Sequence, residues 1–540
     1  MRKILVIFLL CLPLIVKAQG AERIFVSTDR DIYISGDDVW CSLFCFDRET
    51  GHISSFSAVA YVELISAKGT AATAKISLLD GRGAGKFIIP ASTPTGNYSV
   101  VAYTALNVNE DGRGWFAGAK TVSVFNTTSA ARVPGGVVAV EESAYGKGAQ
   151  KEEVSSPELK LSVSGTDAQR TLNLTNRGGD ASLCVSVYRV DDIVSPENRT
   201  MAGFLEGLKA EPAPVLTQKR LPEYEGEIIY AAVEGLKKDD GPAGQSLATL
   251  STAGSPSDVY IGKVLENGRI VFFTNNIYGD RELVCSLSDD AGYISLLDNF
   301  IHPEPEQLPA LEVSRAQYSS LVTRKAALAA APQVDTLEAF LRRRQDGLLP
   351  SIRTRVYHLD DYNRFNTLEE VLIEIVGELS LRKHRGVSYL EMVVQNPVTG
   401  KKSIRENIII MLDGVVIPNL SLIENIDAML LEDIVLYMDY FAMGSVSFDG
   451  AVNFITAKDY VKALRFPEGT RVTDFKGVSY PMSYRGSSQL LLWEPLLQTK
   501  AGETKGFTLS VSSPGNYRVV AQGLNTDGTP LYSVFGFEIK

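Results

Sequence analysis

The chain has 540 residues, of which 45% are hydrophobic and 22% are charged, the balance of an ordinary globular protein that can bury several cores. A chain of this length predicts about three to five domains. The formal net charge of −11, with no basic stripe interleaved with aromatic residues, argues against a nucleic-acid surface.

Residues 1–18 have the pattern of a secretory signal peptide. A positively charged start precedes an apolar run from Ile4 to Val16, and the small residue Ala18 suits signal-peptidase cleavage. The run of about 13 residues is too short to span a bilayer, which needs roughly 20. We therefore expect an exported protein whose mature chain begins near Gln19. A lipoprotein acylated at Cys11 is an alternative, but the apolar run continues past that residue.

Residues 19–126 consist of short alternating runs separated by Gly, Pro, Asn and Asp, which predicts an antiparallel β-sandwich. The segment resembles the macroglobulin-type domain of the alpha-2-macroglobulin family. That family's pattern, Thr-Asp-(Lys/Arg)-x-x-Tyr-x-x-Gly-(Asp/Glu)-x-Val, is matched by Thr28, Asp29, Arg30, Tyr33, Gly36, Asp37 and Val39. Its closing strands are matched by Gly85, Phe87, Pro90, Gly96 and Tyr98. Ser35 stands where the family usually has Pro.

The mature chain would contain four cysteines, Cys41, Cys45, Cys184 and Cys285. The covalent trap of the macroglobulin family needs a Cys-Gly-Glu-Gln thioester, and none of the four has that context. Cys41 and Cys45 are four residues apart on one strand face, about 13 Å, which is beyond disulfide reach. We expect buried thiols that pack as small hydrophobes. A Cys184–Cys285 bridge stays open.

Residues 127–157 lack periodicity and predict a linker. Residues 158–222 predict a small β-domain and residues 223–302 a β-sandwich. The two segments resemble macroglobulin-like or carboxypeptidase-regulatory-like modules of bacterial outer-membrane proteins, and another immunoglobulin-like sandwich fits them nearly as well. Residues 303–354 begin with a Pro-Glu-rich stretch and continue with helical composition, which predicts a helical linker.

Residues 355–457 predict a small α+β domain. Thr367 and Glu370 form a capping box for a helix from Thr367 to Leu379. The pair Asp413-Gly414 lies between two apolar runs and predicts a hairpin. The domain resembles the plug of TonB-dependent outer-membrane receptors, on the residues Leu412, Asp413, Gly414, Val415, Asp433, Ile434, Gly450, Val452, Asn453 and Thr456. Pro418 is displaced from its usual place, and Leu436 replaces a frequently polar residue.

A receptor barrel of about 22 strands needs well over 200 residues. Only 84 residues follow Thr456. Residues 458–540 instead predict a C-terminal β-sandwich, in which "SPGNYRVVAQG" resembles the earlier "TPTGNYSVVAY". The sequence therefore predicts a plug-like module without a barrel, whose surface is available for docking.

No catalytic or cofactor motif is present. The four histidines, at positions 52, 302, 358 and 384, lack a His, Cys or carboxylate partner at metal-ligand spacing. The sequence around Ser246 lacks the second Gly of a nucleophile elbow. No phosphate-binding loop or dinucleotide fingerprint occurs. We expect a protein that is not an enzyme and that binds no metal or cofactor.

The predicted fold is mainly β, with several immunoglobulin-like or macroglobulin-like sandwiches and one small α+β plug-like domain. The expected function is non-enzymatic protein–protein contact at the bacterial outer membrane, in the periplasm or associated with the membrane. The alternative is an accessory of a TonB-dependent uptake system that binds a carbohydrate or peptide. Candidate contact residues are Trp115, Tyr440, Phe441 and Met443; the last three also fit core residues at a strand start. Trp40 is predicted to lie in a strand core.

Overall fold

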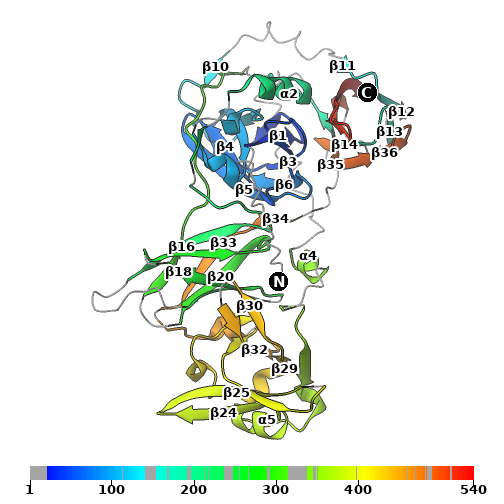
Figure 1. Ribbon diagram of the computed structural model, residues 1–540. Coiled ribbons are helices and arrows are strands. Elements are labelled where there is room, and N and C mark those ends of the chain that lie inside the picture. Colours follow the sequence, from blue (N-terminus) through cyan, green and yellow to red (C-terminus); the bar gives the residue numbers. More distant parts are fainter. Residues whose placement is uncertain are drawn as a thin grey trace, which may run out of the picture.

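The computed structural model describes residues 21–111, 114–139, 154–166, 169–190, 196–212, 215–217, 219–235, 247–254, 256–265, 267–288, 292–313, 337–343, 348–349, 351–396, 398–444, 446–458, 460–467, 469–480, 482, 484, 489–510 and 514–539. The expected signal peptide lies outside these residues. The described chain is mainly β and forms four modules (Figure 1). We name them the N-terminal sandwich (22–125 with 478–479), the C-terminal sandwich (154–189 with 490–539), the central sheet (228–296 with 471–476) and the tip module (354–456).

The N-terminal sandwich packs a three-stranded sheet against a six-stranded sheet. The first contains β1 (Glu22–Thr28), β3 (Asp38–Asp47) and β6 (Arg82–Ile88). The second contains, in spatial order, β2 (Ile32–Ile34), β9 (Lys120–Phe125), β7 (Gly96–Tyr103), β4 (Val59–Ser66), β5 (Gly69–Ser77) and β34 (Val478–Ser479). Alternate residues of β3, such as Val39 and Leu43, face the buried core between the two sheets, as the period of two requires. The two packed sheets agree with the mainly β, sandwich-type fold class that the sequence predicts, and β34 joins them from outside residues 19–126.

The macroglobulin-type motif has a structural role in this sandwich. Tyr33 Oη donates a hydrogen bond to Asp29 Oδ1 over 2.7 Å, and the Trp40 amide donates to the same oxygen over 2.9 Å. Asp37 Oδ2 accepts from Arg30 Nη2 over 2.8 Å and from the Ile34 amide over 2.9 Å. The motif therefore fixes the turn between β2 and β3 through the buried carboxylate of Asp29 and the half-buried carboxylate of Asp37.

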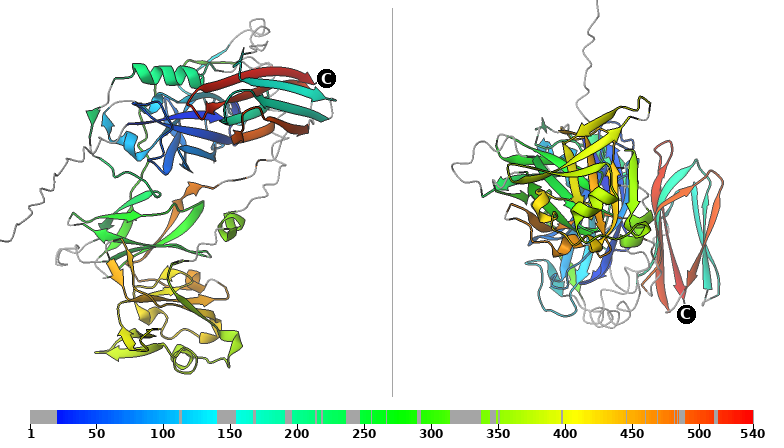
Figure 2. Two further views of the ribbon diagram at one scale, coloured as in Figure 1. Left: turned by 45° about the vertical axis from the view of Figure 1, so that its right-hand side comes forward. Right: turned by 90° about the horizontal axis from the view of Figure 1, so that it is seen from below.

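The C-terminal sandwich is built from two segments that lie far apart in the sequence. The first supplies β11 (Val154–Ser155), β12 (Leu159–Gly165), β13 (Gln169–Asn176) and β14 (Ala181–Arg189). The second supplies β35 (Leu490–Thr499), β36 (Thr504–Ser510), β37 (Gly515–Asn525) and β38 (Pro530–Ile539). The sheets run β11-β38-β37-β14-β35 and β12-β13-β36, so every sheet mixes both segments (Figure 2).

The sequence predicts a small β-domain at 158–222 and a separate sandwich at 458–540. In the structure, strands from these two segments form one sandwich. Leu172 and Leu183 from the first segment share one buried core with Leu509 and Val519 from the second. Neither half covers its apolar face alone, and a single sheet of that kind is not stable without a cover. Hydrophobic alternation shows which faces need covering but not which distant strand covers them.

The central sheet has seven strands in the order β21-β16-β19-β18-β17-β20-β33. These are β16 (Ile228–Glu234), β17 (Leu247–Thr252), β18 (Val259–Val264), β19 (Arg269–Phe273), β20 (Asp280–Leu287), β21 (Tyr293–Leu296) and β33 (Arg471–Lys476). The last strand comes from beyond residue 457, so the module predicted at 223–302 is also completed by a distant segment. Its core includes Ile229, Leu250, Phe272 and Cys285.

The tip module combines two sheets and one helix. One sheet runs β23 (Thr354–His358), β29 (Leu431–Tyr437), β32 (Gly450–Thr456), β27 (Ile408–Leu412) and β28 (Val415–Val416). The other runs β24 (Leu379–His384), β25 (Val387–Gln395) and β26 (Lys402–Arg405). The predicted hairpin is confirmed: Asp413 (φ 50°) and Gly414 (φ 77°) form the turn between β27 and β28. Asp413 then accepts hydrogen bonds from Thr456 and Val461.

The predicted helix of the tip module is shorter than its apolar stripe. Helix α5 (Leu368–Glu374) has the expected capping box of Thr367 and Glu370. It ends at Ile375, so the prediction that the helix reaches Leu379 is wrong. Leu379 is the first residue of β24 and remains in the same buried core. The apolar stripe extends beyond the end of the helix because the helix and the strand after it pack into the same core.

The four modules are nested along the chain. The C-terminal sandwich, the N-terminal sandwich and the central sheet each receive a second segment as the chain returns from the tip module. Helix α2 (Met201–Ala210) joins the two sandwiches, because Phe204 packs against Phe25 and Phe46 of one and shares a cluster with Trp493 of the other. No described helix is long and apolar enough to cross a membrane.

All four described cysteines are buried and none forms a disulfide, which confirms the expectation of buried thiols and decides against the Cys184–Cys285 bridge. Two of them lie in different modules, Cys184 in the C-terminal sandwich and Cys285 in the central sheet.

Candidate functional site

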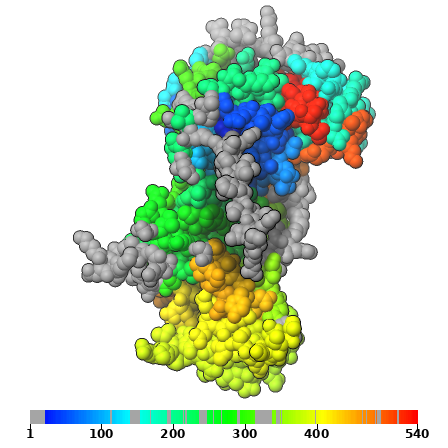
Figure 3. Space-filling model, viewed as in Figure 1, coloured from blue at the N-terminus to red at the C-terminus, as the bar shows by residue number. Residues whose placement is uncertain are grey.

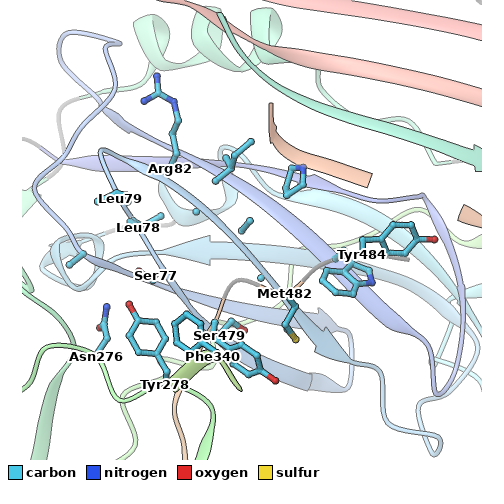
Figure 4. Close-up of a pocket in the computed structure, with 18 of the residues that line it drawn as sticks. Ser77, Leu78, Leu79, Arg82, Asn276, Tyr278, Phe340, Ser479, Met482 and Tyr484 are labelled. Atoms are coloured by element: carbon cyan, nitrogen blue, oxygen red, sulfur yellow. The ribbon is translucent and has the colours of Figure 1, made fainter. Parts of the chain in front are cut away.

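A cavity of about 860 Å³ opens where the N-terminal sandwich, the central sheet and the returning chain meet (Figure 4). We call it the aromatic groove. Seven aromatic side chains line it, and they come from segments that are far apart in the sequence: Trp40, Tyr224, Tyr278, Phe340, Tyr480, Tyr484 and Trp493. Its volume falls within the range of roughly 300–1,000 Å³ typical of ligand sites.

Trp40 and Tyr484 form one end of the aromatic groove. Trp40 lies on β3 between two buried residues, so its side chain points away from the core of the N-terminal sandwich. Its ring contacts Tyr484 edge-on, with centroids 5.8 Å apart, and the Lys86 ammonium lies 5.2 Å from the indole. Trp40 is half-buried, so its predicted place in a strand core is only partly right. It packs on the outer face of the sheet and borders an open cavity.

Tyr278, Phe340 and Tyr480 form the other end. Phe340 belongs to α4 (Leu337–Arg343), and its ring lies 5.2 Å from that of Tyr278 and 5.3 Å from that of Tyr480. Figure 4 shows Tyr278 and Phe340 close together, with Met482 between them and Tyr484. Aromatic pairs at these distances stabilise each other and keep the rings fixed. The groove is therefore preorganised at both ends.

Aliphatic side chains complete the lining, notably Leu78, Leu79, Met482 and Leu496. Leu79 is 76% exposed at the lip, unusually high for a leucine beside a cavity. Charged groups are few. Burial raises the pKa of Glu494 and lowers the pKa of Arg82. Arg82 Nε is buried and has no hydrogen-bond partner among the described residues. The groove thus offers apolar contact and one unsatisfied donor.

A buried polar cluster lies next to the groove and joins the N-terminal sandwich to the central sheet. Glu223 Oε1 accepts hydrogen bonds from Tyr61 Oη over 2.7 Å and from the Ile228 amide over 2.9 Å. Lys75 pairs with Glu227 over 2.6 Å, and Asn299 donates to Glu227 over 3.0 Å. Burial raises the pKa of Glu223 to about 8. The neighbouring Tyr224 lines the groove, so this polar junction sets the position of one groove wall.

The residues predicted to contact a partner do not form one site. Trp115 is half-buried against the N-terminal sandwich, with its indole Nε1 buried and no described partner for it. Phe441 and Met443 lie on β30 (Phe441–Met443) and pack into a cluster shared with Val259 and Ile261 of the central sheet. Their hairpin joins two modules of the chain itself.

Tyr440 is the exposed member of that group, at 64%. The guanidinium of Arg405 lies 4.0 Å from the centre of its ring. A cation at this distance from a ring is an attractive contact within the tip module. Tyr440 therefore remains a candidate contact residue, whereas its neighbours Phe441 and Met443 lie at an internal interface.

The described residues contain no group of three or more His, Cys, Asp or Glu side chains that could hold a metal ion. Two histidines do have carboxylate neighbours, and of these only Asp298, four residues before His302, is close in the sequence. His302 contacts Glu63 and Asp298, and His358 contacts Asp433. Both histidines are exposed, and their contacts with these carboxylates connect neighbouring parts of the fold.

The aromatic groove could not be predicted from the sequence, because its walls come from eight separate segments. The cluster "SYPMSYRG" at 479–486 carries two tyrosines and a methionine within five positions, a density that is one available signal. That signal does not reveal the partners Trp40, Tyr278 and Phe340, which only the fold brings near.

Neither a family model nor a curated protein matches the chain. Solved structures similar to it include the alpha-2-macroglobulin of Salmonella reacted with methylamine, at 10% identity and a TM-score of 0.16, covering 96% of this chain and 23% of that one. The native alpha-2-macroglobulin of E. coli is similar at 9% identity and a TM-score of 0.23, covering 96% and 40%. A tetra-tandem repeat of a large adhesion protein is similar at 10% identity and a TM-score of 0.13, covering 96% and 99%. This chain spans less than half the length of the two macroglobulins.

Proposed function

We propose that this is an exported, non-enzymatic binding protein that acts at the bacterial outer membrane by contact with another polypeptide. The observation that carries the proposal is the aromatic groove, an open cavity of about 860 Å³ with seven aromatic side chains in its walls. Exposed aromatic and aliphatic side chains around a cavity are characteristic of binding sites. The signal-peptide pattern and the plug-like motif of the sequence support the location.

The lining favours a polypeptide over a carbohydrate. Leu78, Leu79, Met482 and Leu496 provide aliphatic surface, which suits the apolar side chains of a peptide. A carbohydrate presents many hydroxyl groups, each of which needs a hydrogen-bond partner once it is buried. The groove offers Arg82 and a small number of amide and hydroxyl groups for that purpose. We therefore assign the groove to an extended segment with apolar anchors.

Panning a display library of 12-residue peptides against the full mature chain tests this assignment. We expect enriched peptides with two or more large apolar residues. Their affinity should fall at least tenfold in the Leu79→Asp and Tyr224→Ala variants, because anchor contacts at interfaces are worth about 1–2 kcal/mol or more. Both side chains are exposed, so neither change removes a core residue.

The matched control is Ile88→Asp. Ile88 lies on β6, the strand that also lines the groove, and is 61% exposed but not part of the lining. Equal peptide binding by all three variants would contradict the assignment. A glycan array run in parallel tests the alternative, an accessory ligand-binding component of a TonB-dependent uptake system. Glycan binding lost in Leu79→Asp, without any enriched peptide, would favour that alternative.

A further inference from the structure

The tip module contains one basic segment, although the whole chain is acidic. Residues 379–405, which contain β24, β25 and β26, hold six Lys and Arg side chains and one Glu, whereas the chain has a formal net charge of −11. Such an asymmetry within an acidic protein points to an anionic partner for the basic part. This segment lies apart from the aromatic groove and is not explained by it.

The sheet of β24, β25 and β26 buries one face and exposes the other. Leu390, Met392 and Val394 point inward from β25 and belong to the core of the tip module. The alternate residues therefore point outward, and this outer face includes Val387, which is 65% exposed, and Ile404 on β26, which is 64% exposed. Large aliphatic side chains therefore remain exposed on this face in the part of the chain that the structure describes.

Free cations border that apolar surface. Arg385 lies in the turn at one end of β25, and Lys401 and Lys402 lie at the other end. Lys383 is also at the first end but stands opposite Ser388, at a position of the inward-facing set beyond the core. All four cations are exposed. None of the four forms an ion pair with a carboxylate of the described residues, whereas Arg382 pairs with Glu391 over 2.9 Å. Arg385 (φ 48°) and Gly386 (φ 86°) form the tight turn between β24 and β25.

The opposite charge lies elsewhere on the same module. Helix α5 exposes Glu369, Glu370 and Glu374 to solvent. An anionic surface attracts the basic sheet and repels the acidic helix. This charge distribution would orient the tip module with the sheet toward such a surface. The module is also the far end of the molecule, as the space-filling view shows (Figure 3).

We propose that the outer face of β24, β25 and β26 binds the surface of a bilayer that contains anionic phospholipids. The two pairs of cations are separated by the nine residues of β25, roughly 30 Å at about 3.3 Å per residue. A flat, extended anionic surface can meet Arg385 at one end and Lys401 and Lys402 at the other end at the same time. Exposed aliphatic residues stand beside each pair, Val387 at one turn and Val398, 90% exposed, at the other. Basic residues interleaved with exposed apolar residues are typical of surfaces that lie on membranes.

Sedimentation of the full mature chain with large vesicles tests the proposal. We expect binding to vesicles of phosphatidylcholine with 30% phosphatidylglycerol, and at least tenfold weaker binding to phosphatidylcholine alone. Each cation near an anionic surface contributes about fivefold to the affinity. The variant in which Lys383, Arg385, Lys401 and Lys402 are all changed to Gln should therefore bind more than a hundredfold more weakly. Raising the salt concentration should lower the affinity of the wild type for anionic vesicles until it approaches that of the variant.

A control variant changes four exposed cations of other modules to Gln: Lys160, Lys209, Lys263 and Arg269. It has the same net charge as the tip variant, and we expect it to bind vesicles like the wild type. A second tip variant, Val387→Ser with Ile404→Ser, should weaken binding while all cations remain. Equal vesicle binding by the two charge variants, or no wild-type binding to anionic vesicles, would overturn the proposal. Tighter binding to soluble poly-glutamate than to vesicles would also overturn it and assign the face to an acidic polypeptide.

Discussion

Replacing Glu223 by Gln should change how the junction between the N-terminal sandwich and the central sheet responds to pH. Glu223 is buried, and its Oε1 accepts hydrogen bonds from Tyr61 Oη and the Ile228 amide. Burial, with a further contribution from nearby Glu227, raises the pKa of Glu223 from 4.5 to about 8. Glutamine keeps the accepting oxygen but does not titrate. A pH dependence that is present in the wild type and absent in the variant is therefore due to titration of Glu223.

The direction in which pH changes the stability of the junction follows from the pKa of the carboxyl group in the open and the closed state. In an opened junction the carboxyl group titrates near 4.5, whereas in the closed junction it keeps its proton up to about pH 8. The closed state therefore binds more protons between these values, and its stability falls as pH rises through that window. One pH unit corresponds to about 1.4 kcal/mol, so raising the pH from 4.5 to 7 costs the closed junction about 3 kcal/mol. The Gln variant should not show this loss.

Hydrogen exchange of the Ile228 amide measures the opening free energy directly, because that amide is bonded to Glu223. We expect the opening free energy to decrease from pH 5 to pH 7 in the wild type relative to Glu223→Gln. The neighbouring Glu225→Gln, which changes an exposed carboxylate on the same segment, is the control and should follow the wild type. Parallel pH profiles for the wild type and Glu223→Gln would show that Glu223 does not hold a proton in the closed junction at neutral pH.

Three further predictions concern the fold. Thr367→Ala removes the capping box of α5 and should cost about 1 kcal/mol of local stability, measured as faster hydrogen exchange in residues 368–374; an unchanged rate would contradict the cap. Thiol titration should find four reactive cysteines per mature chain after denaturation and almost none before it, because burial raises the pKa of thiols such as Cys184 and Cys285 to about 12; fewer than four after denaturation would indicate a disulfide. Removing residues 490–540 should expose the core around Leu172 and Leu183 and make the protein bind a hydrophobic dye, whereas a separate C-terminal domain would leave the remainder unaffected.

The local features of the fold could be predicted from the sequence because they depend on neighbours in the chain. The Asp413-Gly414 turn needs two residues that accept a positive φ, and the cap of α5 needs Thr367 three positions before Glu370. The burial of alternate residues in β3 follows from strand geometry in the same way. Each of these signals lies within a few residues.

The assembly could not be predicted, because strand partners are chosen by fit over long distances. Nothing in β14 indicates that its two neighbours are β35 and β37, about 300 residues later. For the same reason Phe441 and Met443 had the composition of a docking loop, although the central sheet covers them. The aromatic groove depends on these pairings, since β34 and the residues after it carry Tyr480 and Tyr484 back to Trp40.

The central claim is that the aromatic groove holds a segment of another polypeptide. Its most direct test is site-specific photo-crosslinking in growing bacteria that make the protein, with a photoreactive phenylalanine analogue at Leu79 in one strain and at Ile88 in another. We expect a crosslinked polypeptide of defined mass from position 79 and none from position 88. No product at position 79, or the same product from both positions, would contradict it.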